Sequence, residues 1–331
     1  MGMIIIIITV WETIEIIINM KENHKLKKLL LPFIIMCVLI ISACGNSTKN
    51  QATEDTNKDN ESETITYQSE NGPIEVPAHP KRVVVLTGNA GDLIALGINI
   101  VGVDEWSKAS PLFKDQLKDV TTVSDEDLEK IIELKPDLII GDSDNNNLDR
   151  MKKIAPTVTY TYNKVDYLTQ HLEIGKLVNK EQEAQDWIND FKKRAISVGN
   201  EIKAKVGEDS TVTVMESYDK DIGILGNSWG RGTEVLYQAM GLKMPEKVKE
   251  MTSKEGYYMI SSEVLSDYVG DYLVVSKYND QDNSYQETEL YKEMPAVKND
   301  HVIEVDGNAF MFNDSLTLDY QLKHFEEQFL K

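Results

Sequence analysis

The residues best suited to binding chemistry lie in one glycine-rich stretch, residues 226–233. Within it, Trp229 offers a broad aromatic face and an indole N–H, and Arg231 offers a permanently charged, planar fork of donors. Glycines at positions 226, 230 and 232 allow the backbone to approach a bound group closely. Such a stretch could hold a ligand that combines apolar surface with oxygen acceptors. It would equally suit a turn that caps a helix, with Trp229 in the core and Arg231 in a surface ion pair.

Motifs for catalysis do not occur in the sequence. It has no Walker loop, no Gly-x-Ser-x-Gly and no His-Glu-x-x-His. The histidines are scattered, at positions 24, 79, 171, 301 and 324. We therefore expect no enzyme activity, no cofactor and no metal held by a cluster of protein ligands.

Two acidic turns, at 142–147 and 280–282, could suggest a calcium-binding protein. An EF-hand loop, however, needs Gly at its sixth position and Glu at its twelfth. Those positions are held by Asn147 and Lys153 in the first turn, and by Tyr285 and Tyr291 in the second. Both turns fail the test, and we interpret them as solvated loops.

The composition narrows the class of protein further. The chain has 331 residues, with 35 Lys and Arg against 55 Asp and Glu, a net charge of −20. This acid excess argues against broad nucleic-acid binding, which needs a concentrated basic face. The 41% of hydrophobic residues is ordinary for a globular protein, and the length suggests about two domains. Two cysteines exclude a disulfide-stapled scaffold.

The N-terminal segment has the pattern of a secretory signal. A basic stretch at 20–28 leads into an apolar run at 29–41, too short for a stable membrane span. The following Ser-Ala-Cys resembles the bacterial lipobox, in which the cysteine, here Cys44, carries the lipid. We expect residues 1–43 to be a signal peptide, and Met20 to be a better start than Met1, which would make 1–19 a mis-assigned start. A plain signal with a coincidental cysteine is the alternative.

The segment after Cys44 is predicted to be a disordered tether. Residues 46–64 contain no large apolar side chain, so they cannot bury enough surface to offset the entropy of ordering. The predicted lipidated tether spans 44–64, and the folded domain begins at Ile65.

Two stretches of alternating strand and helix patterns predict two α/β lobes with central, mainly parallel sheets. The first lobe, 65–166, starts with a hairpin around residues 70–72. Its predicted strands lie at 80–86, 98–103, 136–141 and 157–161, and its helices at 91–96 and 124–134. The second lobe, 207–331, has predicted strands at 211–216, 272–275 and 301–305, and helices at 232–240 and 316–330.

Helical sequence fills the space between the lobes, at 167–206, with a break near 178–180. Its second part has apolar residues at helical spacing over about 25 residues, which predicts one long rod joining the lobes. Such a rod should permit modest hinge closure and not a wide clamshell motion.

This order of elements resembles the helix-linked substrate-binding proteins of iron-siderophore and cobalamin ABC importers. Residues 127–140, Asp-Leu-Glu-Lys-Ile-Ile-Glu-Leu-Lys-Pro-Asp-Leu-Ile-Ile, are close to a family motif, and 80–86 match the family's first core strand. Residues 226–237 and 312–319 resemble the ferric-hydroxamate-binding lipoproteins of Gram-positive bacteria. The resemblance covers nearly all of residues 65–331.

The resemblance implies a ligand site in the cleft between the lobes. A ferric trihydroxamate already supplies six hard oxygen donors, so the protein need not ligate iron. The matching positions imply ligand contacts from Tyr162, which would donate its hydroxyl across the cleft, and from Trp229 and Arg231. Tyr162 could instead be a core tyrosine.

Two positions depart from the subgroup's pattern. Members often place a tyrosine six residues before the tryptophan, where this chain has Gly223. A Tyr-Trp-Tyr stretch is replaced by 310–312, Phe-Met-Phe, in which Met311 keeps apolar contact without an indole donor and Phe312 remains aromatic. The identity of the hydroxamate is therefore left open.

The resemblance also implies partners: an ABC permease with its ATPase, and the outer face of a Gram-positive cell membrane through the lipid anchor, with the protein a monomer. Glu129 matches the acid of the first lobe that docks on permease arginines, and Glu263 is its expected counterpart. Either acid could simply favour the first turn of a helix.

Other ligands of the same family remain alternatives: haem, cobalamin, and catecholate or carboxylate siderophores. Highly anionic chelates usually need several Arg or Lys in the cleft, and only Arg231 is clearly placed there. This favours a weakly charged hydroxamate complex.

Overall fold

The computed structural model describes residues 63–218, 221–278 and 281–331. The predicted signal peptide, Cys44 and all of the predicted tether but its last two residues lie outside this part of the chain. The described chain opens with the predicted hairpin, β1 (Thr64–Ser69) paired antiparallel with β2 (Gly72–Pro77). Gly72 has φ of 103°, a backbone conformation that favours glycine, at the turn. No helix among the described residues is long and apolar enough to cross a membrane.

The first large sheet has five strands, all parallel, in the order β5-β4-β3-β6-β7. Its strands are β3 (Val83–Val85), β4 (Ile100–Val103), β5 (Thr121–Thr122), β6 (Leu138–Asp142) and β7 (Thr157–Tyr160). The central strands β3 and β6 are buried on both faces, which is why they read as unbroken apolar runs. Helices and short turns connect the strands: α3 (Ala90–Ala95), α4 (Glu105–Ala109), η2 (Pro111–Phe113), α5 (Leu128–Leu134) and α6 (Leu148–Met151).

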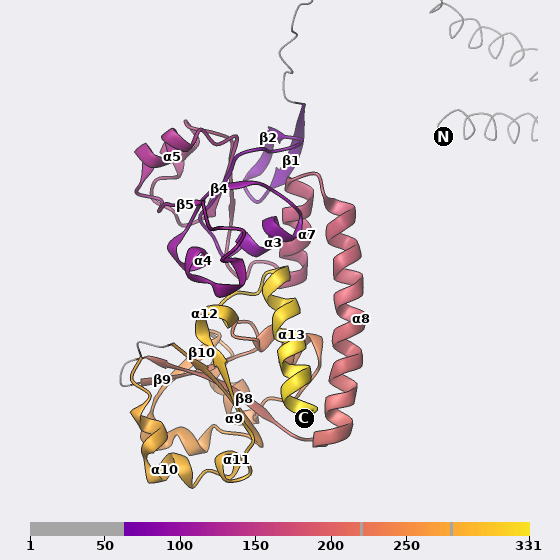
Figure 1. Ribbon diagram of the computed structural model, residues 1–331, viewed down its shortest axis with the longest axis vertical. Helices are drawn as coiled ribbons and strands as arrows, with labels where there is room; N and C mark the ends of the chain where they lie inside the picture. Colours follow the sequence, from indigo (N-terminus) through magenta and orange to yellow (C-terminus); the bar gives the residue numbers. More distant parts are fainter. Residues whose placement is uncertain (1–62, 219–220, 279–280) are drawn as a thin grey trace, which may run out of the picture. The chain divides into compact units, whose positions relative to one another are not determined.

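The helical segment divides as predicted, into α7 (Tyr167–Leu177) and α8 (Glu181–Val206). Asn179, between them, has a left-handed φ of 57°, which ends the first helix. Gly175 lets the two helices approach, because a Cβ there would lie 2.6 Å from that of Ala184. Figure 1 shows α8 running past α7 and alongside α13, in agreement with the contacts between these helices.

The second large sheet also has five strands, in the order β10-β9-β8-β11-β12. Its strands are β8 (Val212–Tyr218), β9 (Asp221–Leu225), β10 (Tyr257–Ser261), β11 (Tyr272–Lys277) and β12 (Val302–Asp306). β8, β11 and β12 run parallel, whereas β9 and β10 add an antiparallel edge that the sequence patterns did not predict. Around them lie η3 (Glu234–Ala239), α9 (Glu246–Thr252), η4 (Ser262–Asp267), η5 (Ser284–Glu287), α10 (Glu289–Lys292), α11 (Pro295–Lys298), α12 (Gly307–Phe310) and α13 (Ser315–Phe329).

One predicted helix differs in kind. Residues 232–240 were expected to be an α-helix, but η3 is a π-helix. The Met240 N–H donates to the carbonyl of Val235 at 2.8 Å. This hydrogen bond spans five residues, as is typical of the wider turn of a π-helix. The predicted fold class, two α/β assemblies joined by a long helix, is otherwise confirmed.

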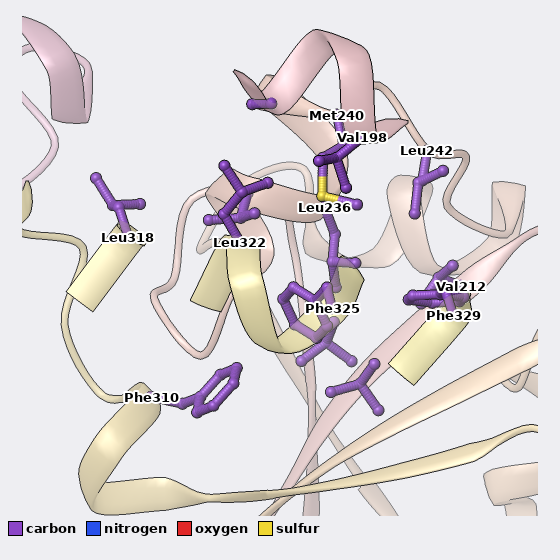
Figure 2. Close-up of a cluster of buried hydrophobic side chains, with 14 of the residues drawn as sticks. Val198, Val212, Leu236, Met240, Leu242, Phe310, Leu318, Leu322, Phe325 and Phe329 are labelled. Atoms are coloured by element: carbon purple, nitrogen blue, oxygen red, sulfur yellow. The ribbon is translucent and has the colours of Figure 1, made fainter. Parts of the chain in front are cut away.

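The long helix α8 contributes to two hydrophobic cores. Ala184, near its start, packs with the side chains around the first sheet. Phe191 and Ile202, further along, pack into the core of the second sheet, together with residues of η3 and α13. Figure 2 shows this second core, where Leu322, Phe325 and Phe329 of α13 gather with side chains of η3 and β8. Since one continuous helix enters both cores, the two assemblies share a rigid support.

A second element also bridges the two sheets. Asp314 caps α13 by accepting from the N–H groups of Leu316 and Thr317, at 3.0 and 3.1 Å. This cap lies directly against α3: a Cβ at Gly91 would lie 1.7 Å from a carboxylate oxygen of Asp314. The Ser315 N–H donates to Asp92 of α3 at 2.8 Å. The C-terminal helix therefore starts in contact with the first assembly and ends in the core of the second.

Candidate ligand site

Two adjoining hollows, of about 670 and 560 Å³, lie where segments of both assemblies meet. The larger is lined by all five residues predicted for the ligand site: Tyr162, Trp229, Arg231, Met311 and Phe312. Asp142 and Tyr218 line both hollows and stand at the carboxyl ends of β6 and β8. Ligands of α/β sheets bind at this end of the strands, so the topology itself favours a site here.

The turn that carries Arg231 is built from three successive left-handed residues. Gly230, Arg231 and Gly232 have φ of 67°, 54° and 87°. Glycine is required at 230 also for space, because a Cβ there would lie 2.3 Å from the carbonyl oxygen of Met311. The Arg231 N–H donates to the carbonyl of Phe310 at 2.8 Å, which ties the turn to the last residue of α12.

The guanidinium of Arg231 is held by a buried carboxylate. Its Nε and Nη2 donate to the two carboxylate oxygens of Glu216 at 2.7 and 3.0 Å, and Glu216 is 1% exposed. Nη2 also donates to the Tyr278 hydroxyl at 3.3 Å. Burial favours the neutral form of the arginine, but the Glu216 carboxylate outweighs it and raises the pKa of Arg231. The charge of Arg231 is thus largely balanced within the protein.

Arg231 therefore does form an ion pair, as the alternative interpretation of the sequence held, although not at the surface. Its side chain is 17% exposed and lines both hollows. No described residue accepts a hydrogen bond from its third nitrogen, Nη1. An arginine fixed through two nitrogens in this way can present the third to a ligand without moving.

Trp229 and Tyr162 form an aromatic contact across the cleft. Their ring centroids are 6.0 Å apart in an edge-to-face arrangement, and Trp229 also lies 4.7 Å from the ring of Tyr257. The Tyr162 hydroxyl donates weakly to the carbonyl of Ser228 at 3.4 Å, and Asn163 donates to the same oxygen at 3.2 Å. Tyr162 is 61% exposed, so the possibility that it is a core tyrosine is wrong.

Phe312 adds another aromatic ring to the lining of the same hollow. It stacks on Phe113, with ring centroids 6.1 Å apart, and it touches the position where a Cβ at Gly88 would stand. Met311 and Phe312 directly follow α12, whose Phe310 is fixed in the second core. The packing of Phe310 thereby fixes where the next two side chains enter the cleft.

Glu234 is a buried acid that stabilises the turn of residues 230–232 through hydrogen bonds. It is 1% exposed and accepts from the Gly230 N–H at 3.1 Å and from the Asn313 amide at 3.0 Å. Burial raises the pKa of Glu234 despite these donors. The acid links the turn of Arg231 to the segment that carries Met311 and Phe312.

The wall from the first sheet is acidic. Burial, and then the nearby carboxylate of Asp144, raise the pKa of Asp142 to about 6. Asp104 lines the smaller hollow and has a pKa raised by burial. Arg231 is the one Lys or Arg in the described linings of the two hollows and is paired with Glu216, so these linings hold an excess of acidic groups.

The two predicted docking acids are not among the residues that line the two hollows. Glu129 and Glu263 are exposed in the first turns of α5 and η4, a position compatible with docking and equally with helix-terminus stabilisation. The described histidines do not cluster; His171, for example, is buried against Asp92 at 2.8 Å. Among the described residues no group of three or more His, Cys, Asp or Glu is placed to hold a metal ion.

Sequence reasoning missed several residues of the cleft. Glu216 and Tyr278 hold Arg231, and Tyr218 lines both hollows. The one available signal was Glu216 itself, a charge at the end of an otherwise apolar strand pattern.

Comparisons with known proteins agree with this geometry. A family model described as periplasmic binding protein matches residues 83–309. The iron(3+)-hydroxamate-binding protein FhuD of Bacillus subtilis (strain 168) is 35% identical over 317 residues, covering 93% of this chain and 100% of that protein. The iron(3+)-hydroxamate-binding protein YxeB of the same organism is 31% identical over 321 residues, covering 94% and 98%.

Solved structures show the same fold. The FhuD protein from S. pseudintermedius superposes with a TM-score of 0.74 at 39% identity, over 81% of this chain and 98% of that one. FhuD2 from Staphylococcus aureus with bound ferrioxamine B superposes with a TM-score of 0.73 at 38% identity, over 76% and 98%.

Proposed function

Because the chain belongs to the periplasmic binding protein family, we propose that it captures ferric hydroxamate siderophores and delivers them to an ABC importer for iron uptake. The observation that carries this proposal is the convergence of Tyr162, Trp229, Arg231, Met311 and Phe312 on one cleft. Another iron chelate, or cobalamin, in the same cleft is the alternative.

The chemistry of the cleft suits a complex whose iron is already saturated. Six hydroxamate oxygens satisfy the metal, so the protein has only to hold the organic shell. Trp229 and Phe312 offer apolar faces to the alkyl linkers, and Nη1 of Arg231 offers a donor to the hydroxamate oxygens.

The charge of the cleft supports the hydroxamate class over more anionic chelates. Glu216 balances Arg231, and Asp142 adds a carboxylate to the lining. A catecholate or citrate complex with several negative charges would meet repulsion here, whereas a neutral or cationic complex would not.

A titration with a panel of chelates tests the proposal. We expect ferrioxamine B and ferrichrome to quench tryptophan fluorescence tightly, and ferric citrate, a ferric catecholate, haem and cobalamin to bind far more weakly. Tight binding of any of the last four, with none of the first two, would overturn the hydroxamate assignment.

Two further parts of the proposal concern the membrane anchor and the contact with the permease. We propose that Cys44 carries a lipid that anchors the protein at the outer face of the membrane, and that Glu129 and Glu263 dock on the permease. Mass spectrometry of the membrane-extracted protein tests the anchor. A mature chain that starts anywhere but at a lipid-modified Cys44 would contradict it.

A further inference from the structure

The cleft has an aromatic residue that no sequence motif indicated, Tyr218, at the last position of β8. It is 38% exposed and lines both hollows, together with Arg231, Met311 and Phe312. It stands on the side of the cleft formed by the second sheet.

The register of β8 and β9 explains how Tyr218 reaches this place. Glu216 pairs with Gly223, and Tyr218 pairs with Asp221. Residues two apart on a strand share a face, and directly paired residues point to the same side. Glu216, Tyr218 and Gly223 therefore lie on one face, whereas Ile222 and Ile224 pack into the core on the opposite face.

Gly223 leaves the space that the ring of Tyr218 occupies. A Cβ at position 223 would lie 2.7 Å from Cε2 of Tyr218 and 3.2 Å from its Cδ2. The same Cβ would lie 3.5 Å from the sulfur of Met259 on β10. The strand thus carries no side chain at this point, and the aromatic ring comes instead from the neighbouring strand, diagonally across the sheet.

From this packing we infer that Tyr218 is a specificity-determining contact of the cleft, packing its ring against an alkyl linker of the bound trihydroxamate. This inference rests on the proposed function. The ring shares the lining of both hollows with the fixed guanidinium of Arg231, so a complex that accepts a hydrogen bond from Nη1 would bring its organic shell against Tyr218. Gly223 acts as a positioning residue, since any side chain there would displace the ring.

Moving the tyrosine from position 218 to position 223 tests the inference. Four variants are titrated with ferrioxamine B and ferrichrome by isothermal calorimetry: Tyr218→Ala, Tyr218→Phe, Gly223→Tyr and the double variant Tyr218→Ala/Gly223→Tyr. Loss of one apolar ring face should weaken binding of at least one complex roughly tenfold, a change of about 1.4 kcal/mol. Tyr218→Phe keeps the ring face and should bind within about threefold of the parent.

The double variant carries the decisive result. Gly223→Tyr alone should weaken binding roughly tenfold or more, because two rings compete for one space. Adding Tyr218→Ala removes the clash and returns a ring to the same place, so the double variant should bind more tightly than either single variant. A double variant no better than Gly223→Tyr, or a Tyr218→Ala variant that binds both complexes like the parent, would overturn the inference.

This experiment separates the inference from the proposed function. If the parent protein binds neither complex, the proposed function fails. If the parent binds and Arg231→Ala weakens binding, while the exchange shows no recovery, the role of Tyr218 alone is wrong. Thermal melting of every variant identifies any that does not fold, and the comparison of the double variant with Gly223→Tyr still discriminates if Tyr218→Ala is unstable.

Discussion

Replacing Glu216 by Gln removes the charge that balances Arg231 while keeping the shape of the side chain. The carboxylate is 1% exposed and accepts from two guanidinium nitrogens and from the Ser276 hydroxyl, at 2.7, 3.0 and 2.9 Å. Breaking one partner of a buried pair typically costs about 3–5 kcal/mol, because the other charge stays buried and unpaired. We expect Glu216→Gln to lower the free energy of unfolding by about this amount.

The matched control is Glu304→Gln. Glu304 also pairs with a cation, Lys277 at 3.0 Å, but its side chain is 50% exposed. Exposed pairs contribute about 0–1 kcal/mol, so this variant should be nearly as stable as the parent. Urea unfolding followed by tryptophan fluorescence measures both values. If Glu216→Gln costs no more than Glu304→Gln, the buried carboxylate does not hold the arginine as we argue.

Glu216→Gln also tests whether the balance of charge in the cleft sets the preference for the ligand. With Glu216 neutral, Arg231 gains an unbalanced positive charge in the cleft. Ferric citrate should then bind more tightly than to the parent, by roughly tenfold for each 1.4 kcal/mol of attraction gained. Unchanged affinity for ferric citrate would show that the balance of charge does not set the preference for the ligand.

Three further predictions follow from the geometry. Gly230→Ala should lower the free energy of unfolding by more than about 2 kcal/mol and abolish binding, because position 230 has a left-handed φ and a Cβ there would collide with a carbonyl oxygen. Gly72→Ala, where a Cβ would meet open space, should cost less, and urea unfolding of the two variants compares these values. Burial beside Asp92 raises the pKa of Asp314 above its unfolded value, so its contribution to stability is present at low pH and lost as pH rises through the folded pKa. Because the folded pKa is about 7, the free energy of unfolding should decline between about pH 4 and pH 7, and Asp314→Asn should shrink this decline; an unchanged slope would contradict the assignment. Replacing Glu129 and Glu263 by Ala should abolish iron uptake in cells while ferrioxamine binding stays intact, and loss of binding would refute a docking role.

The sequence predicted those parts of the fold that local patterns encode. The first sheet was predicted from β-branched runs such as 83–85 and 138–140, and the break before α8 from the sequence at 178–180. β9 and β10 were not predicted, because β9 is short and interrupted by Gly223, and its pairing to β8 depends on contacts distant in the chain. Such tertiary contacts override local propensity.

For the candidate site, the motif residues were found and their partners were not. Trp229 and Arg231 lie in one glycine-rich stretch, and the structure brings them to a common cleft with Tyr162. The partner of Arg231 is fifteen residues upstream, on strand β8, and nothing in the spacing indicates that Glu216 points at it. Burial and ion pairing are properties of the folded chain, so a sequence motif alone leaves the charge of the site undetermined.

The start of α13 against α3 has a consequence for the order in which the protein is made. Phe312 and Leu316 pack against the first core, the Ser315 N–H donates to Asp92 of α3, and Asp314 lies against Gly91. These residues follow β12, the last strand of the second sheet, in the sequence. During synthesis, therefore, the first sheet cannot complete its contacts with residues 312–316 until the strands of the second sheet have been made.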